Sequence, residues 1–297
     1  MPYSRAAKPN EAPRKGFFIA TTALVAALLV APVSVAPAEA AAVGGPATVN
    51  TADFTPDMYE TCFTPVALGE LRTCTSGPDD AKIRVAIMGD SHARQYTPAI
   101  FALGAEYGWQ ITLLSKNACP VLATSQFAKS MNVRGCKTWN GRREKFLKNH
   151  EPFDLIFNST SSWVTGLRPD TAASFAAAVK EQTARGTKFI VIRDNPKPRK
   201  DIKACLTTAG REQANAKCST SRAAALEPID ALAKQITGLK NVQVADFTDK
   251  YCDYKCRPIL DGFNVYRDSS HITPAMATYL TAPINRLVGA EFKVAGQ

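Results

Sequence analysis

Two short segments, far apart in the chain, carry the residue types of a nucleophilic enzyme. Gly-Asp-Ser-His occupies positions 89–92, and Asp-Ser-Ser-His occupies positions 268–271. A serine hydroxyl becomes a good nucleophile when a histidine takes its proton, and a carboxylate holds that histidine in the working tautomer. We therefore expect Ser91 as the nucleophile, His271 as the base and Asp268 as the residue that orients the base. This chemistry requires no cofactor, and none is expected.

The surrounding sequence predicts that both segments follow strands. An apolar run at 82–88 precedes the first segment, and a short strand predicted at 264–266 precedes the second. Further strands are predicted at 111–114, 153–158, 188–192 and 242–246, and helices at 97–107, 139–149, 170–183, 219–236 and 273–288. Short apolar strands that alternate with helices are typical of an α/β fold with a mostly parallel sheet, buried on both faces. Such sheets bind ligands at the carboxyl ends of their strands.

The two segments resemble the first and last sequence blocks of the SGNH hydrolases. The stretches 87–93, 116–120, 193–196 and 265–271 are also similar to the extracytoplasmic SGNH domain often fused to bacterial membrane O-acyltransferases. The resemblance extends from about residue 83 to the C-terminal helix. It implies a three-layer, flavodoxin-like sandwich with Ser91, Asp268 and His271 as the catalytic triad. Proteins that contain this domain modify bacterial envelope glycans.

The oxyanion hole is where the chain departs from the family pattern. The third block of the family, Gly-x-Asn-Asp, is absent, and the chain reads Asn-Ser-Thr-Ser-Ser-Trp at 158–163. The Ser91 N–H is the first expected donor, because a helix start favours developing negative charge. Asn117 and Asn158, each just after a strand, are candidates for the second donor, and either amide could equally cap a turn. His92 is expected to have a structural role, since adjacent residues point apart.

The N-terminus is typical of an exported protein. Four basic residues precede an uncharged apolar run at 16–30, and a small-x-small site ends at Ala40. These features indicate a Sec signal peptide, and the run is shorter than the roughly 20 residues of a membrane span. An uncleaved anchor is the alternative, and either reading places the rest outside the cytoplasm. We expect a signal peptide at 1–40, a linker and lead-in loop at 41–80, and an SGNH catalytic domain at 81–297.

The number of cysteines is also typical of an exported protein. The chain has 8, and these are Cys62, Cys74, Cys119, Cys136, Cys205, Cys218, Cys252 and Cys256. An even number in an oxidising compartment predicts disulfides. Pairing each cysteine with its neighbour closes short loops, but the sequence leaves the connectivity open. The CxxxC at 252–256 could instead bind a metal, but no second such pair or histidine pair accompanies it, so no metal is expected.

The formal net charge of +10 would favour binding to anionic envelope polymers, or it serves only to keep the protein in solution. No block of Lys and Arg with interleaved aromatic residues occurs, so nucleic acid is not an expected partner.

The function that the sequence favours is acyl transfer through an acyl-Ser91 intermediate, with an acetyl group passed to a cell-surface glycan. A separate membrane acyltransferase would then supply the acyl group, since the chain shows no multi-span membrane domain. The first alternative is a secreted esterase in which water is the acceptor. The second is a glycan-binding accessory protein with a vestigial site.

Overall fold

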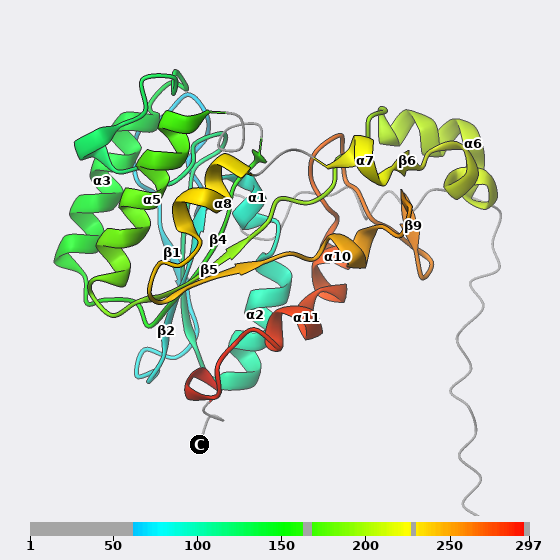
Figure 1. Ribbon diagram of the computed structural model, residues 1–297. Coiled ribbons are helices and arrows are strands. Elements are labelled where there is room, and N and C mark those ends of the chain that lie inside the picture. The colour runs from blue at the N-terminus through cyan, green and yellow to red at the C-terminus, as the bar shows by residue number, and fades with distance from the viewer. Residues whose placement is uncertain (1–61, 163–167, 227–229, 294–297) are drawn as a thin grey trace, which may run out of the picture. The chain divides into compact units, whose positions relative to one another are not determined.

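A six-stranded sheet lies at the centre of the computed structural model, which describes residues 62–162, 168–226 and 230–293 (Figure 1). The signal peptide predicted at 1–40 and the first part of the predicted linker lie outside the described residues. The strands are β1 (Cys74–Ser76), β2 (Arg84–Gly89), β3 (Gln110–Ser115), β4 (Leu155–Ser159), β5 (Lys188–Ile192) and β7 (Val242–Ala245). Their spatial order is β1-β3-β2-β4-β5-β7, and of these six only β1 pairs antiparallel.

The five parallel strands have the flavodoxin-like order, which confirms the predicted α/β sandwich. The chain passes from β2 to β3 on one side and then crosses to β4 on the other. Ligands of such sheets bind at the crevice where the strand order reverses, outside the carboxyl ends of the strands. Gly89 ends β2 at this point, two residues before Ser91.

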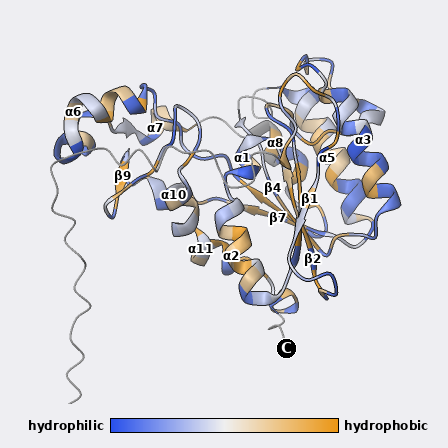
Figure 2. Ribbon diagram, turned by 180° about the vertical axis from the view of Figure 1, so that it is seen from behind, coloured by the Kyte–Doolittle hydropathy of each residue, from blue (hydrophilic) through white to orange (hydrophobic). Residues whose placement is uncertain are grey.

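Helices cover both faces of the sheet (Figure 1). One layer contains α2 (Thr97–Tyr107), α10 (Pro274–Tyr279) and α11 (Thr281–Asn285), and the other contains α3 (Cys136–Asn149), α5 (Pro169–Thr183) and α8 (Asp230–Ile236). Successive side chains of a strand point to opposite faces. In β2, Val85 and Ile87 accordingly join the first core, and Ala86 and Met88 join the second, all four at 0% exposure. The central strands are therefore mostly apolar (Figure 2).

The segment between β5 and β7 differs from the single helix predicted at 219–236. It contains α6 (Ile202–Lys217), β6 (Thr220–Ser221), α7 (Arg222–Ala225) and, after three residues that are not described, α8. The sequence has Pro228 between α7 and α8, and a proline inside a helix removes a hydrogen bond. The alanine-rich composition of this stretch favours one long helix, but Pro228 is incompatible with a continuous one.

The strand predicted at 264–266 is not part of the central sheet, and that prediction was wrong. Instead, β10 (Phe263–Asn264) pairs with β9 (Ile259–Leu260) in a separate two-stranded ladder. Val265 and Tyr266 are buried in the core of the α2 layer. An apolar run in a buried loop has the same sequence signature as a short buried strand, so periodicity could not separate them. The helix predicted at 273–288 likewise divides into α10 and α11.

The remaining elements are short. They are α1 (Ser91–Arg94), η3 (Thr124–Gln126), α9 (Thr248–Tyr251), β8 (Lys255–Cys256), which pairs with β6, and η4 (Ala290–Phe292).

Four disulfides join neighbouring cysteines, and the pairs are Cys62–Cys74, Cys119–Cys136, Cys205–Cys218 and Cys252–Cys256. The first of them ties the lead-in segment to the edge of the sheet. There β1 pairs with β3, an edge strand that the sequence analysis did not predict. The sheet thus begins at Cys74, inside the segment predicted as a lead-in loop.

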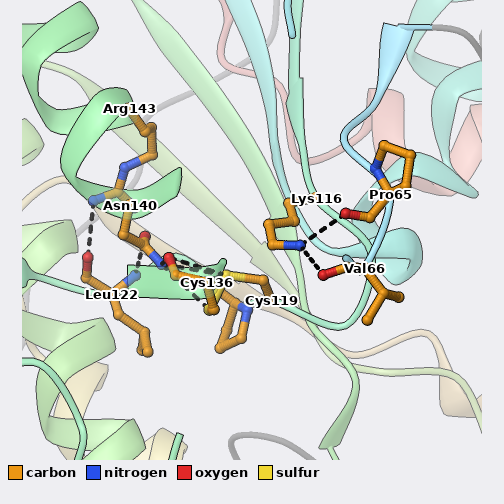
Figure 3. The surroundings of a disulfide bond; sticks show 9 residues. Pro65, Val66, Lys116, Cys119, Leu122, Cys136, Asn140 and Arg143 are labelled. Carbon is orange, nitrogen blue, oxygen red and sulfur yellow. Dashed lines mark hydrogen bonds between the residues drawn. A yellow bond between two sulfur atoms is a disulfide. The ribbon is translucent and has the colours of Figure 1, made fainter. Parts of the chain in front are cut away.

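The loop after β3 is fastened from both sides (Figure 3). On one side, the fully buried Lys116 donates from Nζ to the carbonyl oxygens of Pro65 and Val66, at 2.9 and 2.8 Å, and burial lowers its pKa to about 8. On the other side, Asn140 accepts the Leu122 N–H at 2.8 Å. A loop held in this way can present its backbone to a ligand with little loss of entropy.

The substitution Gly89→Ala tests the tight turn that leads from β2 to Ser91. An added Cβ would lie 2.4 Å from the Ser159 carbonyl oxygen and 2.7 Å from the Ala93 Cβ. We expect the free energy of unfolding to fall by about 2–4 kcal/mol. Gly141→Ala is the matched control, since its Cβ would meet nothing closer than 3.8 Å and should stabilise α3 by up to about 1 kcal/mol. Urea unfolding followed by circular dichroism measures both, and equal effects would contradict the close approach.

Candidate active site

The turn after β2 places Ser91 at the first residue of α1, and Asp90 caps that helix. The Asp90 carboxylate accepts the His92 N–H at 2.8 Å and the Ser161 N–H at 3.0 Å. Its carbonyl oxygen accepts the Ser115 hydroxyl at 3.1 Å. Because Ser115 ends β3 and Ser161 follows β4, one buried residue joins the carboxyl ends of three adjacent strands. Burial raises the pKa of Asp90.

The three residues singled out from the two sequence segments lie together. The Nε2 of His271 is 2.8 Å from the Ser91 Oγ, and its Nδ1 is 2.9 and 3.0 Å from the two Asp268 carboxylate oxygens. Asp268 also accepts the backbone N–H groups of Ser270 and His271, each at 2.8 Å. The imidazole thus lies between the hydroxyl and the carboxylate, an arrangement in which it can take the hydroxyl proton.

The charges around this set favour a neutral imidazole beside an ionised carboxylate. Burial raises the pKa of Asp268, but hydrogen bonding and attraction to His271 outweigh it, so that the pKa falls well below its usual range. For His271, burial lowers the pKa, the hydrogen bond to Asp268 opposes this, and repulsion from His92 and Arg267 adds to the lowering. The net shift is downward, which leaves Nε2 free to accept a proton over a wider pH range.

A bridge of two amide side chains, which the sequence analysis missed, holds the histidine loop against α1. Gln95 accepts the Ile272 N–H at 3.0 Å and donates to the Asn195 Oδ1 at 2.8 Å. Asn195 donates in turn to the Ser270 carbonyl oxygen at 3.0 Å. The bridge therefore joins the helix of Ser91 to the loop of His271. A buried polar residue four positions after the serine was the available sequence signal.

A second histidine–aspartate pair adjoins the first. The Nδ1 of His92 is 2.5 Å from the Asp194 Oδ1, and the ring centroids of His92 and His271 are 4.6 Å apart. Asp194 also accepts the N–H and hydroxyl of Ser162, and the Lys197 Nζ lies 3.2 Å away. The expected structural bonding of His92 is present, and His92 also lines the same cavity as Ser91.

That cavity has a volume of about 440 Å³ and opens over the serine. Its lining includes Ser91, His92, Ala118, Ser161, Lys197 and His271. Among the described residues, no group of three or more His, Cys, Asp or Glu side chains is placed to hold a metal ion. The same part of the chain has no helix that is both long and apolar enough to cross a membrane.

The two amides predicted as second oxyanion donors do not line the cavity. Asn158 is 1% exposed, and its Nδ2 donates to the Met88 carbonyl oxygen at 2.6 Å beneath the turn. Asn117 donates its backbone N–H to Thr64. The residue after it, Ala118, lies in the cavity wall with a left-handed φ of +55°. The backbone N–H groups of Ser91 and Ala118 make no hydrogen bond to any described residue.

Comparisons with known proteins identify similar sequences and folds. The sequence model of the family described as the SGNH domain (fused to AT3 domains) matches residues 61–286. The periplasmic domain of a lipopolysaccharide acetyltransferase from Salmonella ser. Paratyphi A is similar in structure, with a TM-score of 0.54 and 15% identity over 70% of this chain and 84% of that one. At this identity the likeness shows the fold alone.

A CIB-like hydrolase from Thermoplasma acidophilum aligns with a TM-score of 0.30 and 11% identity, over 75% of this chain and 96% of that one. A score this low carries no argument about the chain. None of the curated proteins compared matches the sequence significantly.

The amide bridge can be tested with Gln95→Ala. This change leaves the buried Ile272 N–H without its acceptor, and we expect it to lower the free energy of unfolding by about 1–3 kcal/mol. It should also speed hydrogen exchange at the Ile272 amide. The control is Gln110→Ala, because the Gln110 side chain donates to the Pro78 carbonyl oxygen in an exposed contact and should matter by no more than about 0.5 kcal/mol. Unchanged exchange at Ile272 in Gln95→Ala would contradict the bridge.

Proposed function

The chain belongs to the family of SGNH domains that are fused to AT3 domains, and we propose that it transfers a short acyl group, acetyl in particular, to a hydroxyl of a cell-surface glycan. The family and the fold are those of SGNH-type enzymes that act on acyl esters. One observation carries the proposal, namely the 2.8 Å contact between the Ser91 Oγ and an imidazole that Asp268 orients. We assign Ser91 as nucleophile, His271 as base and Asp268 as its orienting carboxylate.

In the first half-reaction, the Ser91 Oγ attacks the acyl carbon of a donor ester while His271 takes the hydroxyl proton. A bond forms between Oγ and the acyl carbon, and the bond between that carbon and the donor oxygen breaks. His271 then gives its proton to the departing oxygen. Asp268 stabilises the imidazolium that exists between these two proton transfers.

In the second half-reaction, a glycan hydroxyl attacks the acyl-Ser91 ester and loses its proton to His271. The bond between the acyl carbon and Oγ breaks, and His271 returns the proton to Oγ. The glycan then carries the acyl group, and the enzyme is restored. Water in place of the glycan hydroxyl gives hydrolysis by the same steps. Ser269 lines the cavity and is exposed, so water can enter the cavity. For this reason an esterase is the second candidate.

Backbone donors are proposed to stabilise the oxyanion in both half-reactions. The negative charge on the acyl oxygen develops beside Ser91, where a hydrogen-bond donor aimed at it lowers the barrier. The N–H groups of Ser91 and Ala118 belong to cavity-lining residues and make no hydrogen bond to any described residue. The tethers on the loop after β3 would hold the second donor in place. Neither Asn117 nor Asn158 is retained for this role.

Transfer to a glycan is favoured over hydrolysis by the domains to which members of this family are fused. Its members are described as fused to AT3 domains, and the similar Salmonella structure is the periplasmic domain of a lipopolysaccharide acetyltransferase. A membrane acyltransferase that supplies the acyl group is therefore the proposed partner. Four disulfides support an extracytoplasmic location, because oxidising compartments form and keep them.

The nucleophile can be tested with p-nitrophenyl acetate as the acyl donor. We expect intact-mass spectrometry to show the gain of one acetyl group, which peptide mapping places on Ser91. Ser91→Ala should lose the adduct, because among the described residues the Ser91 Oγ is the hydroxyl that contacts the His271 Nε2. Ser219→Ala is the control and should keep the adduct, since Ser219 only donates to the Asn215 carbonyl oxygen. If acetyl and longer acyl esters all fail to label Ser91, the chain is better explained as a glycan-binding accessory protein.

Transferase and esterase are separated by the fate of the acyl group. Addition of purified envelope polysaccharide to the acetylated protein should speed deacylation and place acetyl groups on the polysaccharide, as measured by proton NMR of the recovered polymer. The control is the same polysaccharide after chemical blocking of its hydroxyls, which should leave the rate at the hydrolytic background. Recovery of all label as free acetate at an unchanged rate would establish the esterase.

A further inference from the structure

The buried pair of His92 and Asp194 takes no part in the mechanism above. Both side chains are almost fully enclosed, at 4% and 3% exposure, and the 2.5 Å contact between Nδ1 and Oδ1 is among the shortest in the site. Burying ionisable groups is costly unless they are paired and hydrogen-bonded. The two residues are buried beside His271 in spite of this desolvation cost, which suggests that the pair has a physical role there.

The groups around His92 favour its charged form. Asp194 contacts it from the loop after β5, and Asp90 lies at the start of its own helix. Burial lowers the pKa of His92 and Lys197 opposes the charge, but attraction to Asp194 and Asp90 outweighs both, so the pKa is raised. The same contacts lower the pKa of Asp194 well below its usual range, against the effect of burial. These contacts favour a protonated His92 beside an ionised Asp194.

This cation faces the catalytic base directly. The imidazole rings of His92 and His271 have centroids 4.6 Å apart and are tilted by 38°. The other charged groups that face His271 are Asp268, which contacts its Nδ1, and Arg267, whose Nε lies 3.6 Å from the Asp268 carboxylate. Protonation of His271 therefore places a second positive charge against His92, and like charges at this distance repel.

We propose that His92 and Asp194 act as a positioning pair for the triad. In this pair a fixed imidazolium, packed against His271, keeps that base neutral at rest and makes its protonated form a stronger acid than a free imidazolium. This inference rests on the proposed roles of Ser91 and His271. The pair does not touch the reacting atoms, so His92 and Asp194 are positioning residues and not catalytic ones.

The consequence for the reaction lies in the second proton transfer of each half-reaction. A proton on His271 is held against a neighbouring cation and is therefore passed readily to the departing oxygen. At rest, the same repulsion keeps His271 unprotonated at pH values where a free histidine would begin to charge. The site should consequently keep its base form in mildly acidic surroundings.

The test uses the small number of histidines in the chain, which are His92, His150 and His271. Carbon-13 labelling of the imidazoles gives three NMR titrations in the intact protein. In the wild type, His92 should stay protonated through neutral pH, and His271 should titrate below 6.5. In His92→Asn, which keeps a donor for Asp194 but carries no charge, the midpoint of His271 should move to higher pH. In Asp194→Asn, the midpoint of His92 should fall.

The control is His150→Asn, since His150 stacks on Phe153 and does not line the cavity, and it should leave the His271 midpoint unchanged. The rate of Ser91 acetylation supplies the second readout. Its acidic limb should move to higher pH in His92→Asn and stay in place in His150→Asn. A purely structural role for His92 would lower the rate at all pH values without moving that limb.

The outcomes separate this inference from the proposed function. If His92 titrates as a neutral imidazole in the wild type, or if His92→Asn leaves the His271 midpoint unchanged, the pairing role is overturned even where Ser91 is acetylated. The wild-type titration decides this even if the variant does not fold. If both midpoints behave as expected but no ester labels Ser91, the electrostatic coupling stands and the enzymatic function fails.

Discussion

The buried carboxylate of Asp90 is the contact on which the rest of the site depends. It accepts one N–H from the helix that begins at Ser91 and one from the segment after β4, while its own carbonyl oxygen binds the end of β3. A carboxylate removed from water is costly unless its acceptors are satisfied. The two N–H groups supply that compensation to the carboxylate, and the bond from Ser115 to the Asp90 carbonyl oxygen adds the third strand end. Ser91 therefore takes its position from the register of the sheet.

The parts of the site that do not come from this sheet end are brought to it by polar bridges. His271 lies on a loop that follows a small separate ladder, so the pairing of the central sheet does not place it. Gln95 and Asn195 take that role, because their amides join the helix of Ser91, the loop after β5 and the histidine loop. Each of these bonds is buried or partly buried, and in such surroundings a hydrogen bond is stronger and its loss more costly. The distance between serine and imidazole is thus set by amides that do no chemistry.

Two histidine–aspartate pairs stand side by side in the site, and their environments differ. Asp268 has 39% of its side chain exposed, whereas Asp194 is enclosed with Ser162 and Lys197 around it. An enclosed pair holds its proton tightly, and a partly exposed pair can exchange one with a substrate. The same two residue types therefore have opposite shifts in the two places, since the pKa of His92 is raised and that of His271 is lowered by their surroundings.

The sequence by itself determined the two segments that bring Ser91, Asp268 and His271 together, the alternation of strands and helices, and five of the six sheet strands. These features have local signatures, such as the apolar run at 188–192, which coincides with β5. Only the tertiary structure decided that Asn117 and Asn158 stay outside the cavity, that His92 faces His271, and that Val265 and Tyr266 lie in a buried loop after β10. These outcomes depend on partners far away in the sequence, such as Met88 for Asn158 and Asp194 for His92. Local periodicity and propensity carry no information about such contacts, because they exist only once the chain has folded.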